Sequence, residues 1–192
     1  MRKIIGFRIE IRAHEILRRA KKAGLKPEDA GLDAGRVELL ATDAVKAANP
    51  AVLFETFPPT DPDSSELSSM PGLAYSLILA TLGTGFEAAR SKARQETPEQ
   101  AAWWPVLEEI ALDEIFRFAS ALITDEAAKE SCTISPLSKF SDPAVLRKAL
   151  AKIDSGKIGV TLTDGGFSPA PSSAASLSWL AKSTAKSRGP GR

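Results

Sequence analysis

Residues 73–82 (LAYSLILATL) are almost uninterruptedly apolar and lie between Gly72 and Gly83. A strand with one face in water alternates apolar and polar residues, whereas a strand buried on both faces reads as a continuous apolar run. Ten residues are also too few to cross a bilayer as a helix, which takes about 20. The segment therefore predicts a central strand of a sheet that is covered on both sides.

Other segments of the sequence show helical periodicity, and these helices could cover the two faces of the sheet. A helix is expected over 13–23, with Gly24 as its C-terminal stop. A second helix starts near Asp33 and ends at Asn49-Pro50, because Val37, Leu40, Ala41, Ala44, Val45 and Ala48 share one face.

Three further helices follow from end signals. Gly83-Thr-Gly85 turns the chain into a helix from about 86 to 94. Residues 97–100 (TPEQ) have the pattern of a capping box and open a helix or helix pair to about 129, restarted or kinked at Pro105. Asp142-Pro143 caps a short helix to about 151.

The remaining strands are expected at 7–11, 52–57, 158–163 and 172–180. At 7–11 the evidence is a strict alternation of apolar and charged residues. Strands that arrive singly between helices predict an α+β domain over 1–180, with a mixed, mainly antiparallel, twisted sheet packed with helices. The loop 58–72, rich in Pro, Asp and Ser, is long enough to be either functional or mobile.

Charge and residue counts narrow the class of protein. The 192 residues carry a net charge of only +1, so we expect no nucleic-acid partner, and no membrane partner either. One cysteine (Cys132) and one histidine (His14) allow no internal disulfide and no His-rich metal site, so no metal is expected. The N-terminus lacks a signal-peptide pattern, which predicts a cytoplasmic protein. Residues 181–192 (AKSTAKSRGPGR) are expected to form a disordered basic tail.

Several motifs have both a functional and a plain structural interpretation. Gly83-Thr-Gly85 suits either a phosphate-binding turn or an ordinary tight turn. Trp103-Trp104 could stack a planar ligand or anchor a helix in the core. The acidic group of Glu108, Glu109, Asp113 and Glu114 suits a carboxylate site or a solvated helix face. The structural interpretation is favoured for each of them, as it is for His14 and Cys132, and no catalytic residue is predicted.

Residues 157–172 (KIGVTLTDGGFSPAPS) look most like part of a binding site. Val160 and Leu162 alternate with Thr161 and Thr163, which places one face in the core and the hydroxyls outward or toward a groove. Asp164-Gly165-Gly166 then breaks the strand with a tight turn. The residues alone leave open whether this is a ligand-binding strand or only a strand that needs a turn.

This block resembles the closing segment of the activation domain of vitamin-B12-dependent methionine synthase, which carries an IGVTLTES strand followed by a loop and a small-residue strand. Three other blocks are similar to that family in the same order, namely 16–24 (ILRRAKKAG), 79–87 (LATLGTGFE) and 106–111 (VLEEIA). The resemblance spans roughly residues 7–180 and implies a stand-alone version of this domain, with its α+β fold.

The resemblance also implies a function. Activation domains dock over a corrinoid-bearing domain and present S-adenosylmethionine, while a flavodoxin-like partner supplies an electron and the oxidised cobalt is remethylated. The chain is therefore expected to meet a cobalamin-binding protein or methyltransferase, and to contact cobalamin only through it. Any activity would be part of this reductive methylation. Two alternatives stay open: a non-catalytic interaction module that has lost S-adenosylmethionine, and a binder of another adenosyl or nucleotide ligand.

Site residues follow from the same resemblance. Residues 132–140 (CTISPLSKF) stand where the family has its Arg-x-x-Pro-Gly-Tyr motif, with Thr133 in place of the arginine, Leu137 of the glycine and Ser138 of the tyrosine. Lys139 and Phe140 offer a substitute charge and ring. The ligand groove implied by the resemblance comprises Thr133, Ser135, Pro136, Lys139, Phe140, Thr163, Asp164 and Gly165.

Overall fold

The computed structural model describes residues 1–182 as an α+β fold built on one antiparallel sheet. Five strands lie in the order β1-β2-β3-β8-β4, β5 pairs with β8, and β6 and β7 form a separate hairpin. The strands are β1 (Arg2–Ile5), β2 (Ala51–Phe57), β3 (Ala74–Thr81), β4 (Cys132–Ile134), β5 (Ser138–Lys139), β6 (Thr161–Thr163), β7 (Gly166–Ser168) and β8 (Ser172–Ala181). The helices are α1 (Ala13–Lys22), α2 (Ala34–Ala47), α3 (Ser64–Leu67), α4 (Gly83–Glu96), α5 (Pro98–Ala101), α6 (Trp104–Lys129) and α7 (Pro143–Lys152), with 3₁₀ turns η1 (Glu28–Ala30) and η2 (Ser155–Ile158).

Strand β3 is the centre of the sheet, as its apolar run predicts. It pairs with β2 on one side and with β8 on the other, so that Ile78 lies between Phe54 and Ala175. Ile78 and Ala80 belong to the core on one face, whereas Leu77 and Leu79 belong to the core on the other. The double burial of β3 is therefore confirmed.

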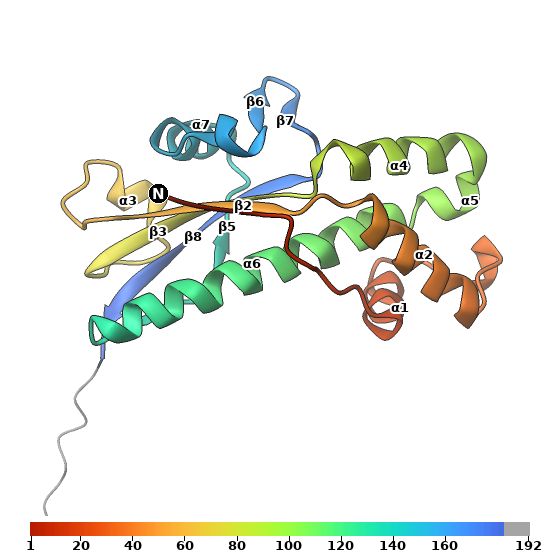
Figure 1. The fold of residues 1–192 in the computed structure, drawn as a ribbon, viewed down its shortest axis with the longest axis horizontal. Helices are drawn as coiled ribbons and strands as arrows, with labels where there is room; N and C mark the ends of the chain where they lie inside the picture. The colour runs from red at the N-terminus through yellow and green to blue at the C-terminus, as the bar shows by residue number, and fades with distance from the viewer. Residues whose placement is uncertain (183–192) are drawn as a thin grey trace, which may run out of the picture.

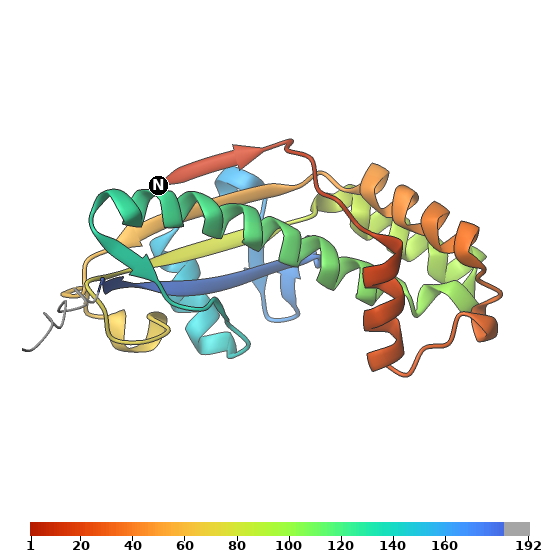
Figure 2. The same ribbon diagram turned by 90° about the horizontal axis from the view of Figure 1, so that it is seen from below.

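The two faces are covered by different sets of helices (Figures 1 and 2). The long helix α6 crosses one face, and α1, α2 and α4 lie beyond the end of the sheet and share a hydrophobic core with α6. The opposite face carries α7, α3 and the β6–β7 hairpin. The second cover is smaller, and loop 58–72 is part of it.

The expected helix ends are largely confirmed. Asp33 accepts a hydrogen bond from the N–H of Arg36 at the start of α2, and Asp142 accepts one from the N–H of Ala144 at the start of α7. Gly24 has φ +76° just after α1, the left-handed conformation in which glycine commonly ends a helix. Pro105 stands in the first turn of α6, which restarts the chain after the short α5.

Three expectations about secondary structure are wrong. Residues 7–11 form no strand, although Ile9 and Ile11 are buried and Arg8 and Glu10 are exposed. Ile158 belongs to η2, and the strand that follows is only Thr161–Thr163, paired with β7 outside the main sheet. The sheet is not mixed either, because every strand pair within residues 1–182 is antiparallel.

The capping box at 97–100 does not form. The Thr97 hydroxyl bonds back to the carbonyl of Ala93 in α4 and leaves the N-terminus of α5 without a side-chain cap. The tail predicted at 181–192 falls mostly on 183–192, outside the described residues. Within residues 1–182 no helix combines the length and the apolar character that crossing a membrane requires.

Candidate functional site

The segment that stands in place of the family's ligand motif runs along the edge of β8. Thr133 lies on β4 opposite Leu180 and is exposed, while Lys139 lies on β5 opposite Ala175. Ser135, between these strands, is only 4% exposed. Phe140 follows β5, donates its N–H to the carbonyl of Ala174 and packs with the core beneath α7.

The charge of Lys139 is already neutralised. Its ammonium lies 2.6 Å from a carboxylate oxygen of Asp113 on α6 and 5.6 Å from the centre of the Phe116 ring. The other oxygen of Asp113 accepts from Arg19 at 2.7 Å. A ligand carboxylate would therefore have to displace Asp113 to reach this cation.

Thr163, Asp164 and Gly165 lie at the exposed tip of the β6–β7 hairpin. The Thr163 hydroxyl is used within the hairpin, where it donates to the carbonyl of Gly166 at 3.1 Å. The alternation expected here is correct for burial, since Val160 is fully buried and Thr161 is exposed. The hydroxyls face solvent at the tip.

The expected groove residues are spread along β8: Lys139 and Phe140 lie beside Ala175 and Ala174, near the hairpin, but Thr133 lies at the far end of the strand. The hairpin precedes the first residue of β8, Ser172, whereas Thr133 pairs with Leu180 near its last residue. Eight residues of extended strand separate these positions, a span of roughly 26 Å. None of the eight candidate residues lines any of the five main cavities of residues 1–182. Thr133 and the hairpin therefore lie at opposite ends of β8, and among the eight residues a ligand carboxylate would meet a cation only at Lys139.

Ser135 instead connects to loop 58–72 through a network of hydroxyl groups. Its hydroxyl lies 2.8 Å from that of Ser69 and accepts the N–H of Ser178 at 2.9 Å. The Ser178 hydroxyl lies 2.8 Å from that of Ser68 and accepts the N–H of Met70 at 3.0 Å. The network fixes the second half of the loop against β8.

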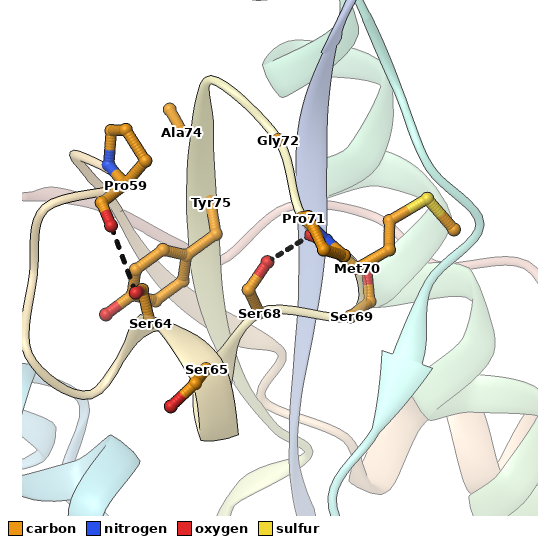
Figure 3. Close-up of a pocket in the computed structure, with 10 residues that line it drawn as sticks. All are labelled: Pro59, Ser64, Ser65, Ser68, Ser69, Met70, Pro71, Gly72, Ala74 and Tyr75. Carbon is orange, nitrogen blue, oxygen red and sulfur yellow. Dashed lines mark hydrogen bonds between the residues drawn. The ribbon is translucent and has the colours of Figure 1, made fainter.

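The loop encloses a cavity of about 470 Å³ over the start of β3 (Figure 3). This volume falls within the usual range of small-molecule sites, about 300–1,000 Å³. The wall is made of hydroxyl and apolar groups, with none that is charged at neutral pH: Ser64, Ser65, Ser68, Ser69, Met70, Gly72, Ala74, Tyr75 and two prolines, Pro59 and Pro71. Figure 3 shows Met70 and Pro71 on one side and Pro59 and Ser64 on the other, with the Tyr75 ring below Pro59.

Tyr75 is the most buried side chain of this wall. It is 1% exposed, its ring stacks on Phe57 at 5.4 Å, and its hydroxyl has no hydrogen-bond partner within the described residues. Burial, and next the nearby carboxylate of Asp61, raise the pKa of Tyr75 to about 12. The hydroxyl is therefore protonated throughout the physiological pH range.

Helix α7 holds the first half of the loop in place by ion pairs. The Lys152 ammonium lies 2.8 Å from Asp61 and 2.9 Å from Asp63, and Lys148 pairs with Glu66. A hydrogen bond from Lys152 lowers the pKa of Asp61, and the hydrogen bonds that Lys152 donates to Asp61 and Asp63 raise its own pKa. These charges surround the cavity but do not line it.

The length and composition of loop 58–72 mark it in the sequence, but they do not predict that the loop borders a cavity. The available signal was the density of hydroxyl residues in 64–69 (SSELSS), directly before the buried strand β3. Ser178 lies opposite these serines because it pairs with Tyr75 across β3 and β8. This position depends on strand register.

The structural interpretations of the other motifs agree with the packing. Trp103 and Trp104 are 1% and 5% exposed, and Trp104 meets Phe86 edge to face. Gly85 packs so closely that a Cβ would lie 2.6 Å from the carbonyl oxygen of Ala47. Cys132 is buried, and His14 is exposed.

The acidic group on α6 is committed to neighbouring cations. Glu108 pairs with Arg90, Glu109 with Arg19, and Glu114 with Arg117. Burial raises the pKa of Glu108, the innermost of the four. No three His, Cys, Asp or Glu side chains in residues 1–182 gather in a way that could hold a metal ion.

Comparison with known proteins adds no assignment: the sequence matches no protein-family model, and it matches no curated protein.

Proposed function

We propose that the chain has a fold like that of the methionine synthase activation domain, and that it docks on a corrinoid protein and supports its reductive reactivation with S-adenosylmethionine. The observation that carries the proposal is the order of the four sequence blocks along one chain, ending in residues 157–177. The single antiparallel sheet with helices on both faces is compatible with it. In this role the chain's task is positioning: it holds a methyl donor near the corrinoid of its partner.

The docking half of the proposal is tested by mixing the purified chain with a cobalamin-loaded corrinoid protein. We expect a complex on size-exclusion chromatography, and loss of the corrinoid absorbance from the free-protein fraction. If no cobalamin-binding protein forms a complex, the docking half fails.

A surface variant locates the contact. Leu73 at the end of loop 58–72 is 56% exposed, and Leu39 on α2 is 58% exposed. If the loop meets the partner, Leu73→Glu weakens the complex, while the matched control Leu39→Glu leaves it intact. Equal effects of both variants would place the contact elsewhere.

The ligand half is tested by calorimetric titration with S-adenosylmethionine. Heat of binding supports reactivation, and its absence removes this half while docking can remain. In that case the chain is a non-catalytic interaction module of the same fold. The contact between Lys139 and Asp113 favours this second candidate, because the one cation among the eight candidate residues is occupied.

A further inference from the structure

One wall of the cavity under loop 58–72 covers a hydroxyl group, that of Tyr75, whose oxygen is exposed neither to the cavity nor to solvent. This hydroxyl makes no hydrogen bond of normal geometry within the described residues, although Asp61 lies close enough to raise its pKa, and leaving a buried polar group unpaired is destabilising. Natural proteins retain such a group mainly where water, an ion or a ligand completes it. On the rim, Ser65 is exposed, and its hydroxyl bonds to no other group of residues 1–182.

The electrostatics of the cavity select against charge. No ionised side chain lines it, and the three nearest carboxylates, Asp61, Asp63 and Glu66, are each paired with a lysine of α7. An ionic ligand would lose its hydration in this cavity without gaining a counter-charge. A neutral ligand meets no such penalty.

The apolar groups of the wall favour a ring-shaped ligand with apolar faces. Two prolines, Met70 and the edge of the Tyr75 ring present rigid or polarisable apolar surfaces around the cavity (Figure 3). The hydroxyls of Ser64 and Ser65 lie on α3 at one side. Apolar faces with a few hydroxyl groups at the edge suit a ring that carries polar atoms in its plane.

We propose that this cavity is a binding site for a small, neutral, planar heterocycle, whose carbonyl oxygen or ring nitrogen accepts a hydrogen bond from the Tyr75 hydroxyl. The site is distinct from the eight residues at 133–140 and 163–165, and it does not depend on docking to a corrinoid protein. Because Tyr75 stays protonated, its hydroxyl has a proton to donate to an acceptor on the ligand. The hydroxyl is sealed beneath the Pro59–Ser64 side of the loop, so binding also requires this half of the loop to shift and to break the ion pairs of Asp61 and Asp63 with Lys152.

The test uses two pairs of probes that differ in charge: nicotinamide with nicotinate, and uridine with uridine monophosphate. Binding to the full chain is followed by thermal shift and by backbone NMR. We expect the neutral member of at least one pair to raise the Tm and to perturb resonances of residues 59–75, and its anionic counterpart to do neither. If neither neutral probe binds, or if the anions bind equally well, the proposal is overturned.

Two variants connect binding to the cavity. Tyr75→Phe removes only the unpartnered hydroxyl, so the free protein should keep or raise its Tm while its affinity for the neutral probe falls about tenfold, as expected for one hydrogen bond of about 1.4 kcal/mol. Ser65→Trp fills the cavity from an exposed position and should abolish the shift. A lower Tm of free Tyr75→Phe would show that the hydroxyl is bonded within the protein, to Asp61 for example, and would exclude it as the ligand donor.

Discussion

The ammonium of Lys139 and the carboxylate of Asp113 lie 2.6 Å apart, although 26 positions separate them in the chain. This contact joins β5 to α6 and neutralises the charge that would otherwise be offered to a ligand carboxylate. Arg19 shares the same carboxylate, which extends the contact into a network that ties α1 to the centre of the fold.

Asp113→Asn should release Lys139 with only a modest loss of stability. The two side chains are 26% and 40% exposed, and partly exposed pairs contribute about 1 kcal/mol or less. If the pairing is what occupies the cation, the variant binds S-adenosylmethionine more tightly in a calorimetric titration. The double variant Asp113→Asn/Lys139→Met is the control and should lose that gain. Equal affinity of the two variants would show that Lys139 plays no part in binding.

Ser178→Ala should destabilise the protein by about 1–3 kcal/mol, because it removes the fully buried hydroxyl that accepts the N–H of Met70 and bonds to the hydroxyl of Ser68. Ser176→Ala is a matched control on the same face of β8. The hydroxyl of Ser176 is fully buried and has no partner, so its removal should leave the stability unchanged or raise it. Urea unfolding midpoints measure both. Hydrogen exchange of residues 66–72 should accelerate only in Ser178→Ala. Similar losses in the two variants would contradict the hydroxyl network.

Gly85→Ala should be strongly destabilising, because the added Cβ would lie 2.6 Å from the carbonyl oxygen of Ala47. We expect the free energy of unfolding to fall by about 1–3 kcal/mol, as it does at other overpacked sites. The control is Gly35→Ala in the first turn of α2, where the nearest atom lies 3.5 Å away and alanine is the better helix former. The Tm values of the two variants are compared by thermal unfolding. If Gly85→Ala keeps its Tm, the packing explanation for this glycine fails, and a phosphate-binding role of residues 83–85 has to be considered again.

The free energy of unfolding should fall as the pH drops through the usual range of carboxyl pKa values and below it. Hydrogen bonds from Arg18 and Arg19 lower the pKa of Glu15 to about 2, and Lys152 lowers that of Asp61. A carboxyl whose pKa is depressed on folding contributes stability above its unfolded value, near 4.3 for glutamate, and loses it as the pH falls toward the folded value. Glu108 acts in the opposite sense, because burial raises its pKa.

The measurement is the urea midpoint between about pH 5 and about pH 3, where this loss is expected to develop. Glu15→Gln should weaken the pH dependence, since glutamine cannot titrate. Glu130→Gln, at the C-terminal cap of α6 and in no ion pair within the described residues, is the control and should leave the slope unchanged. An unchanged slope in Glu15→Gln would argue against the contribution of the Arg18 and Arg19 contacts.

Local signals in the sequence determined most helices and the central strand. Asp33 and Asp142 cap the helices that follow them, and Gly24 ends α1, because these effects act within one turn of the chain. The apolar run of β3 required burial on both faces, and the structure places it between β2 and β8. None of these features depends on a distant partner.

Only the tertiary structure decided how strands pair and which side chains meet. At 7–11 the alternation correctly indicated which side chains are buried, but burial does not specify a backbone hydrogen-bond partner, and Arg2–Ile5 pairs with β2 instead. The hydroxyl network of Ser69, Ser135 and Ser178 joins residues up to 109 positions apart. The cavity under loop 58–72 and the ion pair of Lys139 arise from strand register and helix packing. No local sequence pattern encodes them, because both depend on groups that only the complete fold brings together.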